Sequence, residues 1–322
     1  MGKKIDVLAL GELLIDFIGN GTSSQGNGLF EANPGGAVCN VLAMLNKLGR
    51  KTAFMGKVGN DIFGNLLKNT LDEICIDTQY MLMDEEVRTT LAFVANDETG
   101  ERSFSFYRNP GADMMLTKEE VDEAAIASTR MFHIGTLSMT HEPVREATKK
   151  ALDIAKENGV LISFDPNLRE SLWDSLDDAK EQFAYGMGYC DVLKISDNEI
   201  QWFTGEEDYE KGVRILQDTY HIPLILLSLG RDGSRAYYKD MRVDVPAFIQ
   251  EHTIETTGAG DTFFGSCLHF VLEKGIDDLH EEDLKEMLTF ANAAASIITT
   301  RKGALKVMPS REEVEALRGE RA

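Results

Sequence analysis

The chain has 322 residues, of which 43% are hydrophobic and 27% charged, as in an ordinary globular protein. Its 33 Lys and Arg residues stand against 54 Asp and Glu residues, a net charge of −21. That acidity argues against nucleic-acid partners, because a protein that binds a phosphate backbone needs a basic surface. The longest apolar runs fall far short of the roughly 20 residues that cross a bilayer, which excludes a membrane-spanning protein.

Short apolar runs alternate with amphipathic segments along most of the chain. Continuous apolar runs are typical of parallel strands that are buried on both faces. They predict strands at Ile5–Leu10, Thr52–Val58, Met131–Ile134, Val160–Phe164, Val192–Ile195 and Leu224–Ser228.

Helices are expected between these strands. Apolar residues recur at helical spacing from Val38 to Leu48, after which Gly49 supplies a stop. Asp61 opens a second helix, with Leu66 and Leu67 assigned to its buried face. This alternation predicts an α/β fold with a doubly wound, mostly parallel sheet flanked by helices, in one domain over residues 1–322.

Capping boxes, in which a Ser or Thr is followed three residues later by Glu, predict two further helix starts. One pairs Thr117 with Glu120, and the other pairs Ser310 with Glu313. Near the start of the chain, Asp6 and other acidic residues interrupt the apolar run, so we expect no secretory signal and a cytoplasmic protein.

Two inserted segments, about 12–34 and 88–113, lack helical periodicity and are expected to form a small β-sheet lid. In the second, Leu91 and Phe93 alternate before a turn at Asn96–Glu101, and Phe104 and Phe106 alternate after it, as in a hairpin. In the first, Asn20-Gly21 predicts a tight turn.

The most specific candidate site is the stretch from Glu255 to Gly265, which reads ETTGAGDTFFG and leads into an apolar helical run. Gly258, Ala259 and Gly260 let the backbone approach a ligand, and the amides and dipole of a helix N-terminus attract anions. Asp261 falls in the first helical turn. A carboxylate beside an anion site suits phosphoryl transfer to a hydroxyl, but Asp261 as a simple helix cap is an equally good interpretation.

Two other glycine clusters precede or follow predicted elements. Gly35-Gly36 comes before a helix whose first turn carries Asn40, and SLGRDG, starting at Ser228, ends a buried strand. Either cluster can be an ordinary turn or part of a ligand site at the carboxyl end of the sheet. The Walker loop, the dinucleotide fingerprint and the protein-kinase motifs are all absent from the sequence. A dehydrogenase is therefore disfavoured.

Taken together, these motifs resemble the ribokinase-like (PfkB) carbohydrate kinases over nearly the whole chain. The N-terminal family signature resembles Gly35-Gly36-x-x-x-Asn40 with GKVGNDIFG at Gly56–Gly64, and the C-terminal one resembles TTGAGDTFFG at Thr256–Gly265. Within the family, the segments TTLAFV, GERSFSFYRNPGADMML, FDPNLRESLW and LKISDNE are most similar to fructokinases.

The resemblance implies transfer of the γ-phosphoryl group of ATP to the 6-hydroxyl of D-fructose, with Asp261 as general base and the amides of Gly258, Ala259 and Gly260 as anion hole. It further implies a set of residues that hold the sugar, which comprises Asp16, Gly35, Gly36, Asn40, Arg108, Asn167 and Arg169. The set implied for the nucleotide comprises Lys194, Ser228, Gly230, Gly233 and Asn292.

The resemblance also implies cations and partners. Mg²⁺ would enter with ATP, with Glu199 holding it through water, and a K⁺ site would involve Glu255, Thr257 and Gly303. The family usually has Asp where this chain has Glu255. A homodimer through the lid is expected from relatives. The alternatives are a 2-keto-3-deoxygluconate kinase, whose acidic substrate would suit Arg108 and Arg169, and a non-catalytic sugar or nucleotide sensor.

Overall fold

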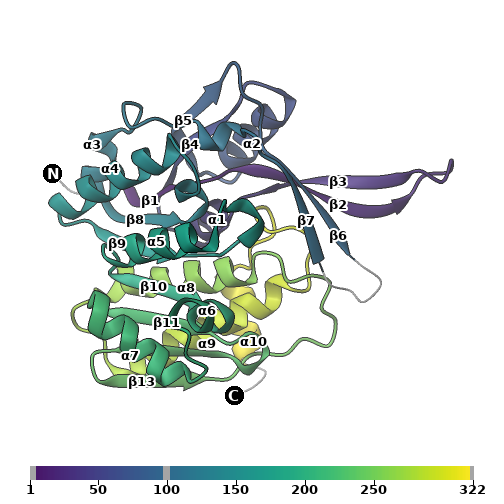
Figure 1. Cartoon of the computed structure of the whole chain (residues 1–322). Coiled ribbons are helices and arrows are strands. Elements are labelled where there is room, and N and C mark those ends of the chain that lie inside the picture. Colours follow the sequence, from purple (N-terminus) through teal and green to yellow (C-terminus); the bar gives the residue numbers. More distant parts are fainter. Residues whose placement is uncertain (1–4, 97–101, 320–322) are drawn as a thin grey trace.

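The structure, a computed structural model, describes residues 5–96 and 102–319. A nine-stranded sheet runs through the centre of the molecule in the order β13-β12-β11-β10-β9-β8-β1-β4-β5 (Figure 1). The strands from β11 to β5 are all parallel, and β12 and β13 add an antiparallel hairpin at one edge. The nine strands are β1 (Ile5–Leu10), β4 (Thr52–Gly59), β5 (Asp77–Asp84), β8 (Thr129–Gly135), β9 (Leu161–Asp165), β10 (Val192–Ser196), β11 (Leu224–Ser228), β12 (Ser234–Tyr238) and β13 (Met241–Val245).

Helices cover both faces of this sheet, so each parallel strand is buried on two sides. In β1, Val7 and Ala9 pack into one core while Leu8 and Leu10 pack into the other. The first core contains residues of α1 (Ala37–Lys47), α2 (Ile62–Glu73), α8 (Ala259–Lys274), α9 (Glu281–Ile298) and α10 (Arg311–Gly319). The second contains residues of α3 (Glu123–Ser128), α4 (Val144–Glu157), α5 (Leu176–Met187), α6 (Asp197–Thr204) and α7 (Tyr209–Tyr220). The doubly wound α/β fold predicted from the sequence is confirmed.

A second sheet of four strands extends from one end of the first (Figure 1). Its order is β3-β2-β6-β7, with β2 (Leu14–Thr22) and β3 (Gly28–Gly35) from one segment and β6 (Leu91–Asn96) and β7 (Arg102–Tyr107) from the other. These are the two segments in which the sequence predicts a lid. Most of the turn expected at Asn96–Glu101, and the side chain of Phe104, lie outside what the structure describes.

Three local expectations are wrong. The first hairpin reverses at residues 23–27 instead of at Asn20-Gly21, where β2 carries a bulge next to β3. Thr117 and Glu120 do form hydrogen bonds, but they close a turn, and α3 begins later with Asp122 as its N-cap. Leu66 lies on the outer side of α2 and is 37% exposed, because Leu67 and Leu71 provide the contacts with the core.

Other local predictions are confirmed. Asp61 caps α2 by accepting hydrogen bonds from the amides of Phe63 and Gly64, and Ser310 and Glu313 form the reciprocal bonds of a capping box before α10. The strands β5, β12 and β13 were not predicted. Residues of β5 and β13 are partly exposed, whereas β12 is mostly buried.

Candidate active site

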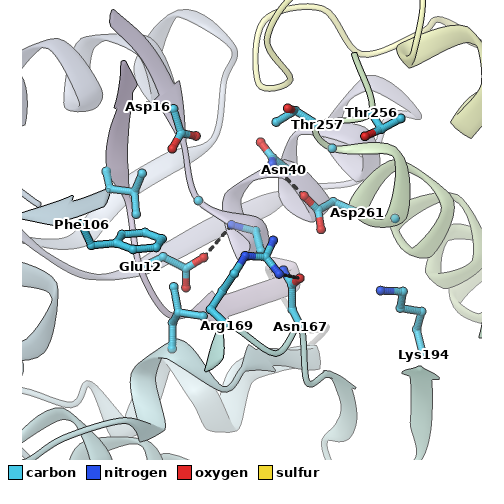
Figure 2. Close-up of a pocket in the computed structure, with 16 residues that line it drawn as sticks. Glu12, Asp16, Asn40, Phe106, Asn167, Arg169, Lys194, Thr256, Thr257 and Asp261 are labelled. Atoms are coloured by element: carbon cyan, nitrogen blue, oxygen red, sulfur yellow. Dashed lines mark hydrogen bonds between the residues drawn. The ribbon is translucent and has the colours of Figure 1, made fainter. Parts of the chain in front are cut away.

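A pocket of about 420 Å³ opens at the carboxyl ends of the central parallel strands, and its lining includes residues of β2 and β7 from the second sheet (Figure 2). In open α/β sheets, ligands bind at this edge, close to the point where the strand order reverses, here between β8 and β1. The pocket is lined by Glu12, Leu14, Asp16, Gly36, Ala37, Asn40, Phe106, Leu137, Asn167, Arg169, Lys194, Thr256, Thr257, Gly258, Gly260 and Asp261.

Asp261 lies in the first turn of α8 and lines this pocket, with only 9% of the residue exposed. Its Oδ2 accepts a hydrogen bond from Nδ2 of Asn40 at 2.7 Å (Figure 2). Asn40 belongs to the first turn of α1, so the N-termini of two helices meet at this carboxylate. Both helix dipoles favour negative charge at this point.

The electrostatic surroundings of Asp261 suit a proton acceptor. Burial raises the pKa of Asp261, while the hydrogen bond from Asn40 and the positive charges of Lys194 and Arg169 act in the opposite direction. The net effect is a raised pKa. Because a stronger base accepts a proton more readily, this carboxylate is better suited to general base catalysis than an exposed aspartate would be.

The turn that starts α8 presents backbone amides to the pocket. Gly258 has a φ of 76°, and a Cβ at this position would lie 2.7 Å from the Cβ of Ala304, so glycine is required. Lys194 adds a positive charge here, since its Nζ would lie 3.3 Å from a Cβ placed on Gly260. This arrangement of a helix N-terminus and an ammonium group attracts anions.

Lys194 of β10 forms a buried ion pair with Asp165, the last residue of the neighbouring strand β9. Its Nζ lies 3.0 Å from both carboxylate oxygens of Asp165, and the two side chains are 7% and 3% exposed. Burial raises the pKa of Asp165 to about 7 despite the charge of Lys194, and the surrounding carboxylates raise the pKa of Lys194 against the effect of its own burial. Lys194 therefore stays positively charged.

The floor of the pocket is formed where β2 and β3 meet α1. Asp16 lies over Gly35, where any Cβ would collide with its carboxylate. Gly36 has a φ of 137°, and a Cβ there would lie 2.5 Å from the carbonyl oxygen of Glu12. Burial raises the pKa of Asp16 to about 6, an effect that Arg169 opposes. Gly35 thus leaves room for the carboxylate of Asp16, and Gly36 leaves room for the backbone of Glu12, at the start of α1.

Glu12 is a pocket residue that the sequence interpretation missed. It is 3% exposed, and its Oε1 accepts a hydrogen bond from the amide of Ala37 at 2.6 Å. Leu14, Ala37, Leu137 and Thr256 were missed as well. The position of Glu12 two residues after a predicted strand was a usable signal, because carboxyl ends of parallel strands carry ligand sites.

We expect Glu12→Gln to stabilise the protein in a pH-dependent way. Burial raises the pKa of Glu12 from 4.5 to about 7, so between these pH values the folded chain holds a proton that the unfolded chain releases. Stability therefore falls as the pH rises through this interval. Urea unfolding should give equal stabilities for Glu12→Gln and wild type at pH 4, and an advantage of about 3 kcal/mol for the variant at pH 8. The exposed Glu181→Gln is the control, and a pH-independent offset for Glu12→Gln would contradict the assignment.

Asn167 and Arg169 follow β9 and lie in the pocket as the sequence interpretation expects. Nη1 of Arg169 donates hydrogen bonds to Oδ1 of Asn167 at 2.9 Å and to the carbonyl of Leu168 at 3.0 Å. Figure 2 shows Arg169 between Glu12 and Asn167, with Phe106 of β7 on the same side of the pocket. A cationic and an aromatic side chain therefore lie beside the carboxylate of Glu12 in the pocket.

Arg108, which was expected in the sugar pocket, does not line it. Its Nε donates to Asp113 at 2.7 Å, and its two Nη atoms donate to Oγ1 of Thr140 and to the carbonyl of Leu137, both at 2.9 Å. The guanidinium instead borders a neighbouring cavity of about 410 Å³, which Phe106 also lines. The reason is steric and electrostatic, since Asp113 holds this side chain inside the protein at 4% exposure.

A second pocket of about 290 Å³ lies on the other side of the α8 turn and shares Thr256 with the first. Gly230 and Asn292, both expected at a nucleotide, line it. The amide of Asn292 accepts from Ser234 Oγ at 2.9 Å and donates to the carbonyls of Val245 and Pro246, so it fixes the pocket wall. Ser228 and Gly233 lie nearby, at the end of β11 and directly before β12, without lining it.

Glu199 does not line the main pocket, and its carboxylate is occupied by the chain itself. Oε1 accepts from the amide of Leu168, and Oε2 accepts from the amide and hydroxyl of Ser196, all at 2.8 Å. Burial by itself would raise the pKa of Glu199, but Lys194 and these hydrogen bonds lower it. Within residues 5–96 and 102–319, no group of three His, Cys, Asp or Glu residues is arranged to hold a metal ion. Because both carboxylate oxygens of Glu199 already accept hydrogen bonds, this side chain fits a cation held through water better than one bound directly.

Glu255, Thr257 and Gly303, the residues expected at a K⁺ site, lie around the loop that precedes α8. Glu255 is 7% exposed, and its Oε1 accepts a hydrogen bond from the amide of Gly303 at 2.7 Å. Thr257 lines the main pocket. The segment before α8 and the segment after α9 are therefore joined through one carboxylate.

Comparison with known proteins agrees with this geometry. Residues 4–311 match the profile of the pfkB family carbohydrate kinases. The chain belongs to this family. This pfkB kinase is 42% identical to fructokinase-2 of Zea mays, over 94% of its own length and 91% of that protein. The structure of fructokinase from Xylella fastidiosa with bound ATP superposes with a TM-score of 0.89 at 29% identity, covering 99% of each chain.

A further fructokinase structure carries several ligands together. It is a double mutant from Vibrio cholerae O395 in a form with fructose, ADP and a potassium ion bound, and it covers 98% of this chain and 99% of that one, with a TM-score of 0.86 and 30% identity. The resemblance inferred from the glycine motifs is confirmed, and this pfkB kinase is a phosphotransferase that acts on a sugar. No helix in the described parts of the chain is both long and apolar enough to cross a membrane.

Proposed function

We propose that this pfkB kinase transfers the γ-phosphoryl group of ATP to the 6-hydroxyl of D-fructose, giving fructose 6-phosphate and ADP. The observation that carries the proposal is the placement of Asp261, buried in the pocket, held by Asn40 and next to the amides that start α8. Fructokinases at about 40% identity over nearly the full length support fructose as the sugar.

In the proposed reaction, Asp261 accepts the proton of the sugar hydroxyl as its oxygen bonds to the γ-phosphorus. The bond between that phosphorus and the bridging oxygen breaks, and ADP leaves with the bond's electron pair. The amides of Gly258, Ala259 and Gly260 stabilise the charge on the transferred group, with Gly258 and Gly260 more available because the Ala259 amide also donates to the Thr256 carbonyl at 3.2 Å. Positioning and charge stabilisation are what such transfers need from a protein.

The two substrates are assigned to the two pockets. We propose that the sugar is held by the main-pocket residues Asp16, Gly36, Asn40, Asn167 and Arg169, together with Gly35, which lies against Asp16. The pocket with Gly230 and Asn292, flanked by Ser228 and Gly233, is assigned to the nucleoside. Lys194 is assigned to the phosphates. Mg²⁺ enters as part of the Mg·ATP substrate, with Glu199 holding it through water, and K⁺ is assigned to the loop of Glu255, Thr257 and Gly303.

The lid is proposed to pair with a second copy of the chain. Leu29, Phe30 and Tyr107 on the second sheet are 47%, 54% and 65% exposed, and large exposed apolar side chains on one sheet favour an interface. Light scattering at twice the chain mass would support this homodimer, and a monomer would contradict it.

The test of the function is ADP release from Mg·ATP with fructose, 2-keto-3-deoxygluconate, ribose, glucose and mannose, each in KCl and in NaCl. We expect fructose to be strongly preferred, because Glu12, Asp16 and Asp261 make the pocket acidic. Of the two arginines that would suit a substrate carboxylate, Arg169 lines the pocket and Arg108 is held by Asp113. Preference for 2-keto-3-deoxygluconate would instead identify the protein as a 2-keto-3-deoxygluconate kinase. No release with any sugar, from protein that binds ATP, would indicate a sensor. Equal rates in both salts would remove the K⁺ assignment.

A further inference from the structure

A buried polar cluster joins the base of the lid hairpin to the body of the domain. Thr90 directly precedes β6, Arg108 directly follows β7, and Asp113 lies in a short 3₁₀ turn after the hairpin, at Ala112–Met114. Thr90, Arg108 and Asp113 are 0%, 4% and 3% exposed. None of the three lines the main pocket.

One carboxylate connects the two strands of the hairpin at their base. Oδ1 of Asp113 accepts a hydrogen bond from the hydroxyl of Thr90, and Oδ2 accepts one from Nε of Arg108 at 2.7 Å. Thr90 and Arg108 are the residues at which the chain enters and leaves the hairpin. The carboxylate of Asp113 therefore fixes how these two ends lie relative to each other.

The guanidinium of Arg108 then joins the hairpin to the loop after β8. It donates to Oγ1 of Thr140 and to the carbonyl of Leu137, both at 2.9 Å, and Thr140 Oγ1 itself donates to that carbonyl at 3.0 Å. Leu137 lines the main pocket. Planar guanidinium groups impose direction on their hydrogen bonds, which lysine cannot reproduce.

The same strand carries an aromatic side chain into the pocket. Phe106 lies two residues before Arg108, so both side chains point to the same side of the chain where it leaves β7. Phe106 lines both the main pocket and the neighbouring cavity that Arg108 borders. Phe106 thus lies over the pocket two residues from Arg108, so the hydrogen bonds that hold Arg108 also restrict where Phe106 lies.

We propose that Arg108 and Asp113 are positioning residues that set the angle of the β6–β7 hairpin and hold Phe106 and the lid over the sugar. This inference rests on the proposed function for its kinetic consequence. A buried ion pair adds little net stability because desolvation offsets the attraction, but it favours one arrangement of the groups it joins. Neither residue touches the substrate in this assignment.

The test compares Arg108→Lys and Asp113→Asn with wild type, with Arg242→Lys as the control because Arg242 forms an exposed ion pair with Asp244. We expect the KM for the sugar to rise on the order of ten-fold or more and the ratio of sugar-independent ATP hydrolysis to kinase activity to increase, because a misplaced lid admits water. The KM for ATP should change little.

A second measurement does not depend on activity. Hydrogen exchange of the amides at Leu91–Val94 and Ser105–Tyr107 should be faster in both variants than in wild type and in Arg242→Lys. The exchange rates of amides in α8 and α9 should stay the same in all four proteins. Unchanged exchange and an unchanged hydrolysis ratio in folded variants would overturn the proposal. A rise in KM that vanishes with a sugar analogue lacking one hydroxyl would also overturn it, since Arg108 would then be a direct sugar contact. Failure of the wild type to phosphorylate any sugar would contradict the proposed function and leave the exchange experiment to decide on the positioning role.

Discussion

Asp261→Asn is expected to lower kcat by on the order of 100-fold or more while changing the KM for fructose and the affinity for ATP only slightly. Asparagine keeps an oxygen that can accept the hydrogen bond from Asn40, so the pocket should keep its shape. What is lost is the group that accepts the proton from the attacking hydroxyl, an interaction that is made in the transition state alone.

Steady-state kinetics with fructose and calorimetric titration with ATP measure these two effects separately. Asp177→Asn is the matched control. Asp177 also lies in the first turn of a helix, α5, but it is exposed and does not line the pocket. Turnover near the wild-type value in Asp261→Asn would remove Asp261 from the role of general base. A parallel loss of ATP affinity would assign it to binding instead.

Lys194→Met is expected to cost about 3–5 kcal/mol in stability and most of the kinase activity. The stability loss follows from the buried ion pair, because Asp165 would keep its carboxylate without the ammonium group 3.0 Å away. Without Lys194 the pKa of Asp165 should rise further, so its protonation should make the loss smaller at pH 6 than at pH 8. The activity loss follows from the position of Nζ next to Gly260.

A double variant separates the two effects. Replacing both members of a buried pair by apolar residues of similar size is close to neutral for stability, so Lys194→Met with Asp165→Leu should unfold in urea nearly as wild type does. Its kinase activity should stay low, since no positive charge returns to the phosphate site. The exposed pair of Lys68 and Asp72 gives the control, as Lys68→Met should cost less than about 1 kcal/mol. Recovery of activity in the double variant would contradict the phosphate role of Lys194.

Local sequence patterns were enough for the scaffold. Continuous apolar runs such as Leu224–Leu227 predicted the buried parallel strands, because both faces of the sheet are covered and every side chain of such a strand is buried. The turn at Gly258 and the position of Asp261 in the first turn of α8 are also local, since glycine conformation and helix geometry depend on neighbouring residues. The glycine motifs carried the family resemblance because their turns, too, depend on neighbouring residues in the sequence.

Two local signals did not give the element that they predict. Asn20-Gly21 has the composition of a tight turn, but pairing of β2 with β3 extends past it and leaves a bulge there. Thr117 and Glu120 form only half of a capping box. The amide and hydroxyl of Thr117 donate to the Glu120 carboxylate, but the Glu120 amide donates to the Thr117 carbonyl and not to its hydroxyl, and α3 begins only after Asp122. Strand pairing outweighed the local signal at Asn20-Gly21, whereas at Thr117 the bonds that would cap a helix are incomplete.

The sequence by itself determined most of the central parallel strands and the helices that begin at Ala37, Ile62 and Ala259. It also showed that an aspartate stands in the first turn of the last of these, at a helix start that attracts anions. The tertiary structure alone decided which side chains meet. Asn40 and Asp261 are 221 residues apart in the chain and bond at 2.7 Å, and Lys194 joins Asp165 across two strands. It also turned Arg108 toward Asp113 and brought Glu12 into the pocket. Such contacts depend on the crossing of strands and helices that are distant in sequence, and no pattern within one segment encodes them.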